Sequence, residues 1–312
     1  MKSSTATGTT GTAERPAAPR RGRFAPSPTG PLHAGSLLAA VGSYLDARAQ
    51  GGEWLLRMED VDRGRDVPGA ADDILRTLEA FGLDWDGPVL FQSSRGEAYA
   101  AALSNLRSQG LVYDCSCSRA ELGPPDIPYP GSCRPGPRRT GVAIAQRFLT
   151  LGSTPVTFVD RAQGPYAQSV ADAVGDFVLR RRDGYWAYQL AVVVDDAASG
   201  ITDVVRGHDL LDNTPRQRLL QAALGLPYPT TLHLPLLLDA DGTKRSKSRQ
   251  PLPADTREAP QLLTTLLTLL RHPPPPELRS SPVVDQLAWA IINWNISLIH
   301  NVTSIYSNEH HL

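Results

Sequence analysis

Hydrophobic and polar positions in the stretch 23–48 predict a short strand, a tight turn and a helix. Four turn-forming residues exclude regular structure after the strand: Pro26, Pro28, Gly30 and Pro31. Five apolar residues then recur at helical spacing: Leu37, Leu38, Val41, Tyr44 and Leu45.

Three small or polar residues stand where this helix opens: His33, Gly35 and Ser36. The N–H groups and the dipole at a helix start favour a negative charge. The stretch is therefore a candidate phosphate site, in which Gly35 allows close approach and His33 donates to a phosphate oxygen. Ordinary packing is the alternative explanation of the same pattern.

The alternation of strands and helices continues to residue 110. Residues 53–60 predict a second strand that ends in acidic residues, residues 70–81 an amphipathic helix, and residues 97–109 a further helix. This order is typical of a parallel α/β sheet, whose ligands bind at the carboxyl ends of the strands. Both His33 and Glu59 fall at such ends.

The alternation of predicted strands and helices stops at residue 111 and resumes at residue 176. Proline and glycine are dense between residues 123 and 137, so we interpret residues 111–175 as an insertion that divides the sheet domain into halves at 23–110 and 176–250. The second half predicts strands at 177–180 and 185–196 with a hairpin turn between them, then a strand, turn and helix start at 201–211, and a helix at 214–224.

Four polar residues of the second half receive separate interpretations. The paired acids Asp195 and Asp196, which end the apolar run, predict a solvated loop or a helix cap. Arg206 ends a strand that faces the presumed cleft, so it is a candidate for binding an anion. His208 is interpreted as structural.

The two ends of the chain differ from its centre. Residues 1–22 contain no hydrophobic stretch, so they predict a disordered tail and not a signal peptide. Residues 251–312 predict two helices, at 261–270 and 285–300, separated by four consecutive prolines. We interpret this part as a small helical appendage.

Composition limits the classes of function. The chain has 312 residues, 41% of them hydrophobic, which is enough for one sizeable core. Because its net charge is −1, any contact with nucleic acid must be confined to a local surface of complementary shape. No apolar run approaches the length of a membrane span, so we expect a cytoplasmic protein, without a membrane partner and monomeric.

All three cysteines, Cys115, Cys117 and Cys133, lie in the insertion. An odd number favours reduced thiols in a reducing compartment. An insertion so rich in proline and glycine has little apolar core, so we predict one structural zinc ion, with packed thiols as the alternative. No histidine lies between residues 36 and 206, which leaves four candidates for the fourth ligand: Tyr129, Asp126, Glu121 and water.

A second candidate phosphate site lies in a glycine-containing loop at residues 239–248. Lys244 and Lys247 are three residues apart there. Lysine carries a compact charge that can follow a migrating phosphate oxygen. An exposed basic loop is the alternative.

Two of these separated stretches resemble the signatures of class I aminoacyl-tRNA synthetases. Pro31-Leu-His-Ala-Gly-Ser is similar to their HIGH motif, and Lys244-Arg-Ser-Lys-Ser is similar to their KMSKS loop. The lead Arg23-Phe-Ala-Pro-Ser-Pro-Thr-Gly, with Arg57-Met-Glu-Asp and Val205-Arg-Gly, resembles the glutamyl and glutaminyl branch. The resemblance covers residues 22–250 and implies a Rossmann-type α/β catalytic domain that uses ATP with Mg²⁺.

Within that branch the chain resembles the glutamyl-queuosine tRNA(Asp) synthetases. A glutamyl-tRNA synthetase continues past the KMSKS loop into a large helical anticodon-binding domain, and too few residues follow Ser248 for one. The zinc pattern of the truncated family, Cys-x-Cys, then Tyr, then Cys, matches the three cysteines here and implies Tyr129 as the fourth ligand. Two positions depart from the motifs: Ser36 replaces the second histidine of HIGH, and Arg245 replaces the apolar residue of KMSKS, which puts the loop's closed packing in question.

The resemblance implies a two-step reaction. L-glutamate is activated with ATP without tRNA, and glutamyl-adenylate then transfers glutamate to the queuosine base at the wobble position of tRNA(Asp). Catalytic roles fall to His33, Lys244 and Lys247, with Gly35 and Ser36 completing the ATP site. The implied glutamate pocket has eight residues: Arg23, Phe24, Ala25, Pro26, Ser27, Glu59, Tyr188 and Arg206. Which arginine holds the side-chain carboxylate stays open.

Six arginines are candidates for contact with the RNA backbone, with a solvated basic face as the alternative: Arg134, Arg138, Arg139, Arg180, Arg181 and Arg182. Two other functions compete with the main reading. One is a shortened but ordinary glutamyl-tRNA synthetase. The other is a non-catalytic tRNA-binding paralogue, against which the presence of His33, Lys244 and Lys247 argues.

Overall fold

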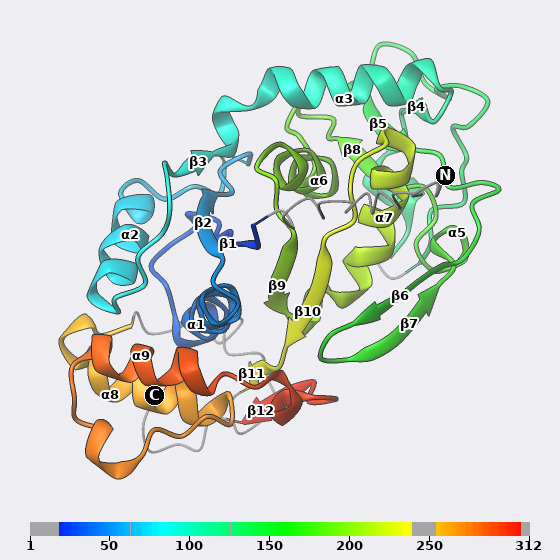
Figure 1. Cartoon of the computed structure of the whole chain (residues 1–312). Helices are drawn as coiled ribbons and strands as arrows, with labels where there is room; N and C mark the ends of the chain where they lie inside the picture. The colour runs from blue at the N-terminus through cyan, green and yellow to red at the C-terminus, as the bar shows by residue number, and fades with distance from the viewer. Residues whose placement is uncertain (1–18, 63, 125–126, 239–253, 307–312) are drawn as a thin grey trace, which may run out of the picture.

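The computed structural model describes residues 19–62, 64–124, 127–238 and 254–306, and Figure 1 shows how its elements are arranged. One parallel sheet holds β1 (Arg21–Phe24), β2 (Glu53–Met58) and β3 (Leu90–Phe91). The crossovers between these strands contain α1 (Ala34–Ala49) and α2 (Ala70–Ala80), which confirms the predicted strand and helix order.

A second parallel pair, β9 (Asp203–Gly207) and β10 (Thr230–Leu234), continues this layer on the other side of β1. The backbone N–H of Thr202 donates to the carbonyl of Arg21 over 2.9 Å, and β1 and β9 are neighbours in Figure 1. The spatial order β3–β2–β1–β9–β10 therefore changes direction at β1. In open α/β sheets, ligands bind outside the carboxyl ends of the strands at such a point.

The main hydrophobic core lies around α1. Its side chains Leu37, Val41 and Leu45 are buried against the sheet. Gly42 lets the helix approach β10, because a Cβ there would lie 2.5 Å from a methyl group of Leu234. Close contact between this helix and the sheet fixes where the start of α1 stands relative to the strand ends.

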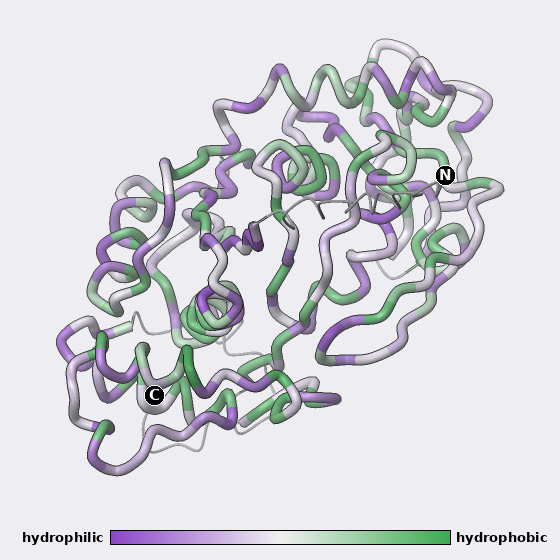
Figure 2. Tube along the Cα trace, in the orientation of Figure 1, coloured by the Kyte–Doolittle hydropathy of each residue, from purple (hydrophilic) through white to green (hydrophobic). Residues whose placement is uncertain are grey.

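A second core joins the insertion to the rest of the catalytic domain. It is built by α3 (Gly96–Ser108), α6 (Tyr188–Ala198) and α7 (Thr214–Leu224). These helices pack on an antiparallel sheet of β4 (Val112–Cys115), β5 (Ala145–Phe148) and β8 (Val178–Arg180). Figure 2 shows hydrophobic colour in the middle of β9 and on much of α6.

The insertion also contains elements that the sequence pattern did not predict. A hairpin is formed by β6 (Val156–Asp160) and β7 (Gly164–Gln168), and two short helices are α4 (Arg119–Leu122) and α5 (Val170–Ala173).

The prediction of a strand at residues 185–196 was wrong, because most of this run forms the helix α6. Seven of its eleven residues are buried, so the apolar positions form no narrow stripe. A short, continuous apolar run does not distinguish a buried strand from a buried helix.

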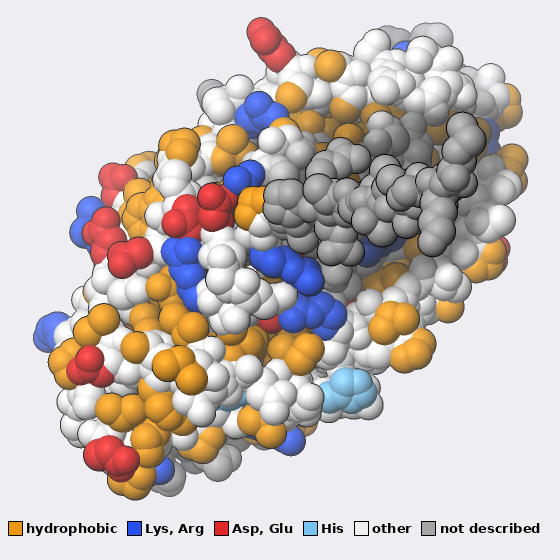
Figure 3. Space-filling view, viewed as in Figure 1, with side chains coloured by type: hydrophobic (Ala, Val, Ile, Leu, Met, Phe, Trp, Pro, Cys, Tyr) orange, Lys and Arg blue, Asp and Glu red, His pale blue; other side chains and the backbone are white. Residues whose placement is uncertain are grey.

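The C-terminal part consists of α8 (Ala259–Leu269) and α9 (Val283–Asn293), followed by a 3₁₀ turn (Ile296–Ile299). The predicted second helix therefore ends earlier than residue 300. Leu263, Leu266 and Leu287 of these helices enter the main core beside α1. Apolar side chains also gather on the outer surface over α8 and α9 in Figure 3, where Val284 and Ile292 are exposed.

Short elements complete the described chain. They are β11 (Leu236–Leu238), β12 (Ser304–Tyr306), and further 3₁₀ turns at Gln92–Ser94, His208–Asn213, Thr256–Glu258 and Pro276–Leu278. In the part of the chain that the structure describes, every helix is too short or too polar to traverse a lipid bilayer.

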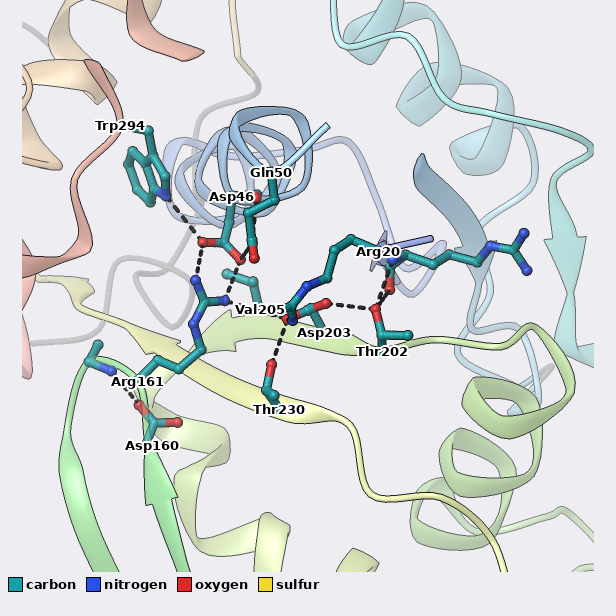
Figure 4. A network of polar contacts seen from close by, with 12 residues as sticks. Arg20, Asp46, Gln50, Asp160, Arg161, Thr202, Asp203, Val205, Thr230 and Trp294 are labelled. Carbon is teal, nitrogen blue, oxygen red and sulfur yellow. Dashed lines mark hydrogen bonds and ion pairs between the residues drawn. The ribbon is translucent and has the colours of Figure 1, made fainter. Parts of the chain in front are cut away.

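One buried carboxylate links three parts of the fold, as Figure 4 shows. Asp46 of α1 accepts two hydrogen bonds from the guanidinium of Arg161, at the tip of the β6–β7 hairpin, over 2.6 and 2.9 Å. The indole N–H of Trp294, which follows α9, donates to the same carboxylate over 3.2 Å. Asp46 therefore ties the first helix to the insertion and to the C-terminal part.

We expect the substitution Asp46→Ala to lower the free energy of unfolding by about 3 kcal/mol, because Arg161 and Trp294 would lose a buried acceptor. Urea denaturation followed by circular dichroism measures this change. The matched control is Asp73→Ala, which removes an exposed i,i+3 pair with Arg76 on α2 and should change stability by less than about 1 kcal/mol. Equal effects of the two substitutions would contradict the linking role of Asp46.

Candidate active site and metal centre

The start of α1 forms one wall of the candidate active site, at the carboxyl end of β1. His33 is the N-cap residue, and its Nδ1 atom accepts the backbone N–H of Ser36 over 3.1 Å. The ring proton therefore lies on Nε2, which is 3.0 Å from the Ser36 hydroxyl. A Cβ at Gly35 would lie 3.2 Å from the imidazole, so glycine makes room for this ring. The result is an imidazole N–H beside the backbone N–H groups of a helix start, an arrangement that suits an anion.

The centre of the site is a buried ion-pair cluster around Asp196. One oxygen of its carboxylate accepts from Arg57 over 2.6 Å and from Arg23 over 3.3 Å. All three side chains are at most 7% exposed. The prediction that Asp196 lies in a solvated loop or helix cap was therefore wrong. It sits inside α6, where helix packing carries it under the strand ends.

The neighbouring acid, Asp195, is also buried, and it has a different set of hydrogen-bond partners. Its carboxylate accepts hydrogen bonds from Gln92 over 2.9 Å, Arg95 over 3.0 Å and Tyr99 over 2.5 Å. It therefore anchors α3 and the preceding turn to α6. The predicted solvated role was wrong for this residue as well.

Glu59 adds a second carboxylate to the cluster. Arg57 donates to its carboxylate over 3.2 Å, and the backbone N–H of Glu59 donates to the carbonyl of Pro26 over 2.8 Å. Burial raises the pKa of Glu59 even though Arg57 and Arg23 oppose the change. Burial likewise works against the Arg57 cation, but Asp196 and Glu59 outweigh it and raise the pKa of Arg57.

Arg206 supplies a third buried guanidinium, and it has a different set of partners. It donates to His233 Nε2 over 3.0 Å, to the Thr214 hydroxyl over 2.8 Å, to the Leu210 carbonyl over 3.1 Å and to the Tyr188 hydroxyl over 3.4 Å. All of these acceptors are uncharged. Among the described residues, no carboxylate lies within ion-pair distance of Arg206.

Tyr188 shows that these charged groups share one site. Burial raises the pKa of its hydroxyl, and Glu59 raises it further, while Arg206 and Arg23 lower it. The site therefore contains three guanidinium groups, those of Arg23, Arg57 and Arg206, and two carboxylates. A buried cation without an acid partner is the feature expected of a subsite for a carboxylate ligand.

The other residues predicted for the glutamate pocket lie at the end of β1 and directly after it. Phe24 is buried and stacks on Trp54 at 6.2 Å between ring centroids. Ala25 is half-buried, Pro26 is buried and Ser27 is exposed. The predicted catalytic lysines, Lys244 and Lys247, lie outside the described residues, as does Arg245.

The three cysteines of the insertion come together as predicted. The sulfur atoms of Cys115, Cys117 and Cys133 all lie within 4.8 Å of one another. The hydroxyl of Tyr129 is 3.4 Å from Cys115 Sγ and 3.5 Å from Cys117 Sγ. A tetrahedral ion with metal–sulfur bonds of about 2.3 Å needs ligand separations of about 3.8 Å. Three buried sulfurs and one phenol oxygen therefore fit a four-coordinate metal ion.

The pKa values of the candidate ligands are shifted in different directions. Burial opposes ionisation of Cys133, but backbone hydrogen bonds from Ser116 and Arg138 lower the pKa of this thiol to about 6. The other two ligands whose pKa is shifted behave in the opposite way: burial and the bonds with Cys115 and Cys117 raise the pKa of Tyr129, and burial raises the pKa of Cys117 to about 11. A metal ion that binds here must therefore displace their protons. Metal ligands of this kind bind as thiolate and phenolate.

Of the two acidic alternatives for the fourth ligand, Glu121 has other partners. Glu121 is occupied as the capping-box partner of Ser118, over 2.7 Å, and pairs with Arg139 over 2.8 Å. Asp126 lies outside the described residues. Among the described candidates, Tyr129 is the one placed to complete the set.

Three of the six arginines proposed for RNA contact brace the insertion. Arg134 forms a bidentate pair with buried Asp176 over 2.7 and 3.1 Å, and Arg139 donates to the Ser116 carbonyl over 2.5 Å. Arg182 donates to the Cys117 carbonyl over 3.1 Å. The other three lie at the surface. Arg180 stacks on the Trp186 ring, and Arg181 pairs with Asp62 and Asp183. Arg138 is exposed. Their role in RNA binding stays a prediction.

Several residues that shape the site were not singled out from the sequence. Arg57 belongs to a quoted motif but was given no role, and Asp160, Asp176 and His233 were not considered. A polar residue inside an otherwise apolar strand was an available signal for His233, because such a residue is normally paired when buried.

Comparison with known proteins agrees with the geometry. The profile of the family described as tRNA synthetases class I (E and Q), catalytic domain, matches residues 20–124 and 140–262, more than half of the chain. The chain is 53% identical over 289 residues to the glutamyl-Q tRNA(Asp) synthetase of Dechloromonas aromatica, covering 90% of this chain and 96% of that protein. It is 54% identical over 283 residues to the glutamyl-Q tRNA(Asp) synthetase of Thiobacillus denitrificans, covering 88% and 93%.

Among solved structures, the glutamate-tRNA synthetase of Elizabethkingia anophelis has a similar fold. The TM-score is 0.77 at 24% identity, and the match covers 94% of this chain and 69% of that one. This likeness establishes the fold.

We expect Tyr129→Phe to weaken metal binding at least about tenfold, since it removes one of four ligand atoms. Competition with a chromogenic chelator, followed by elemental analysis, measures the affinity. Tyr113→Phe is the matched control, because the Tyr113 hydroxyl donates to Asp176 over 2.6 Å and not to the sulfur cluster. Full retention of metal by the Tyr129 variant would remove this residue from the ligand set.

Proposed function

The chain belongs to the class I tRNA synthetases and, within them, to the glutamyl-Q tRNA(Asp) synthetase family, and we propose that it glutamylates the queuosine base of tRNA(Asp). In the first step L-glutamate and ATP form glutamyl-adenylate and pyrophosphate. In the second step the glutamyl group passes to a hydroxyl of the queuosine at the wobble position. The choice of amino acid rests on one observation: the buried guanidinium of Arg206 has no acid partner among the described residues, in a site that also contains the Glu59 carboxylate.

The charges of the site match those of glutamate. Among the described residues, the acceptors of the Arg206 guanidinium are all neutral, and it would receive the side-chain carboxylate. Glu59, whose charge acts on Tyr188 as that of Arg206 does, would hold the substrate ammonium. Arg23 is neutralised by Asp196, so its part is to hold the strand end and complete the positive field, rather than to supply the main carboxylate contact.

The adenylation step asks for position and charge compensation more than for covalent chemistry by the protein. A carboxylate oxygen of glutamate attacks the α-phosphorus of ATP, and the bond to the bridging oxygen of pyrophosphate breaks. His33 Nε2 and the N–H groups at the start of α1 bind phosphate oxygens. Lys244 and Lys247 neutralise the charge that grows on pyrophosphate. Mg²⁺ bound to ATP shares that charge.

The transfer step uses the same cleft. The cyclopentenediol of queuosine carries two neighbouring hydroxyls, as does the terminal ribose that ordinary synthetases acylate. One hydroxyl oxygen attacks the carbonyl carbon of glutamyl-adenylate, AMP leaves, and the hydroxyl proton is lost to solvent or to a phosphate oxygen. The anticodon loop would then enter where a relative takes an acceptor end.

The metal of the insertion is proposed to be zinc with a structural role. Closed tetrahedral sites rich in thiolate are typical of structural zinc. The three cysteines and Tyr129 form a small core of their own. Among the described residues, the partly buried apolar side chains that pack against it are Tyr113 and Leu122. A bound ion would therefore supply stability that apolar burial cannot.

Labelled glutamate tests the proposed activity. With ATP and bulk tRNA, label should accumulate on tRNA(Asp) that contains queuosine. It should be absent from tRNA(Asp) with guanine at the wobble position and from tRNA(Glu). Periodate treatment, which cleaves the queuosine diol, should abolish labelling. Gel separation of individual tRNAs with autoradiography provides the measurement.

Two outcomes would refute this proposal. Label on tRNA(Glu) would indicate an ordinary glutamyl-tRNA synthetase. Absence of glutamate-dependent exchange between ATP and pyrophosphate would indicate a protein that only binds tRNA.

A further inference from the structure

A chain of hydrogen bonds runs from the β6–β7 hairpin to Arg206. Asp160 ends β6, and its Oδ2 atom lies 2.6 Å from His233 Nδ1. His233 Nε2 in turn lies 3.0 Å from Arg206 Nε. Asp160 is 1% exposed, His233 is fully buried and Arg206 is 6% exposed. The chain therefore connects the insertion to the site across β10 without access to water.

The positions of the protons in this chain follow from chemistry. An arginine Nε is a donor only, since the guanidinium stays protonated. His233 Nε2 must then be the acceptor, which places the single ring proton on Nδ1. That proton is donated to Asp160. The carboxylate thus selects the one neutral imidazole tautomer that can accept from Arg206.

Asp160 itself is held firmly as a carboxylate. Its Oδ1 atom accepts the backbone N–H groups of His233, Ala162 and Gln163 over 3.1, 3.1 and 3.0 Å. Burial disfavours its charge, but the bonds from His233 and the backbone outweigh burial and lower the pKa of Asp160 to about 2. Burial is also the main cause that lowers the pKa of His233, so the ring is neutral.

The hairpin tip that carries Asp160 is fixed on three sides. Arg161 is paired with Asp46 of α1. The side chain of Gln163 donates to the carbonyls of His233 and Val302 over 2.9 and 3.0 Å. The backbone of Ala162 accepts the N–H of Asn301 over 2.8 Å. The acid at the start of the chain therefore has a rigid position.

We propose that His233 and Asp160 are positioning residues that aim the Arg206 guanidinium at the carboxylate of the substrate. This inference rests on the proposed function, in which Arg206 binds glutamate. His233 holds the Nε atom of Arg206. The Thr214 hydroxyl and the Leu210 carbonyl hold one terminal nitrogen of the same guanidinium. The other terminal nitrogen, which meets the Tyr188 hydroxyl, keeps a donor for a ligand. The hairpin thus sets substrate affinity from outside the pocket.

The substitution Asp160→Asn tests the proposal by changing the proton pattern without changing shape. The three backbone N–H groups retain the amide oxygen, so the amide NH₂ faces His233 Nδ1. The His233 ring must then accept at Nδ1 and carry its proton on Nε2. The Nε2–H group would face the Nε–H group of Arg206, so two donors would meet and the hydrogen bond to Arg206 would be lost. We expect the KM for glutamate in pyrophosphate exchange to rise about 10- to 100-fold, with the KM for ATP unchanged.

The matched control is Asp176→Asn. Asp176 is also a buried acid, and its carboxylate accepts from Arg134, Tyr113 and Thr150, away from the chain of bonds that leads to Arg206. This variant should keep the wild-type KM for glutamate. An equal rise in KM for both variants would reduce the effect to loss of fold and overturn the proposal.

Nitrogen NMR of protein labelled in histidine provides a readout that does not depend on activity. The wild type should show the His233 ring protonated at Nδ1, and Asp160→Asn should show it protonated at Nε2. The signal is assigned by its loss in His233→Gln. A wild-type ring protonated at Nε2 would overturn the proposal, whereas a protein inactive with glutamate but with the expected tautomer would refute only the proposed function.

A second pair of variants keeps the test decisive if Asp160→Asn does not fold. Glutamine at position 233 can accept from Arg206 and donate to Asp160, whereas leucine can do neither. His233→Gln should therefore retain a lower KM for glutamate than His233→Leu. Equal KM values for these two variants would overturn the positioning role.

Discussion

The carboxylate of Asp196, shared by two buried guanidinium groups, is the interaction on which the rest of the site depends. Arg23 comes from β1 and Arg57 from β2, while Asp196 comes from α6, which belongs to the second core. One acid thus fixes the two halves of the catalytic domain to each other at the strand ends. A buried ion pair of this kind contributes little net stability, because desolvation opposes it, but breaking it by losing one partner is costly.

That arrangement also explains the charge of the cleft. Asp196 and Glu59 compensate two of the three guanidinium groups, and Arg206 is left with neutral acceptors. Asp160 does not pair directly with the Arg206 guanidinium, since the His233 ring lies between the two side chains. The protein therefore holds a cation ready for a carboxylate ligand. Holding it requires a scaffold that cannot relax, which the hairpin, α1 and the C-terminal part supply together.

Local signals in the sequence predicted the elements that build this scaffold but not the contacts between them. The turn after β1, the helical period of α1 and the proline at the start of α7 are local properties, and these elements form as predicted. The run 185–196 was assigned to a strand because burial on all sides removes the period that marks a helix. For the same reason, Asp195 and Asp196 appeared as solvated acids.

The candidate site divides in the same way. Cys115, Cys117 and Cys133 lie close in sequence, so their convergence could be predicted, and the described part of the chain brings Tyr129 to them. The pairing of His233 with Asp160 joins residues 73 positions apart, and nothing local to either residue reveals it. Long-range partners of buried charges follow from packing and not from any local pattern.

Calorimetric titration of L-glutamate into the wild type and into Arg206→Gln is the most direct test of the central claim. The account predicts that the substitution weakens binding at least about 100-fold, because the buried cation that awaits the carboxylate is gone. Arg48→Gln, which removes an arginine paired with Asp86 outside the site, should bind as the wild type does. Unchanged glutamate affinity in a folded Arg206→Gln protein would contradict the account.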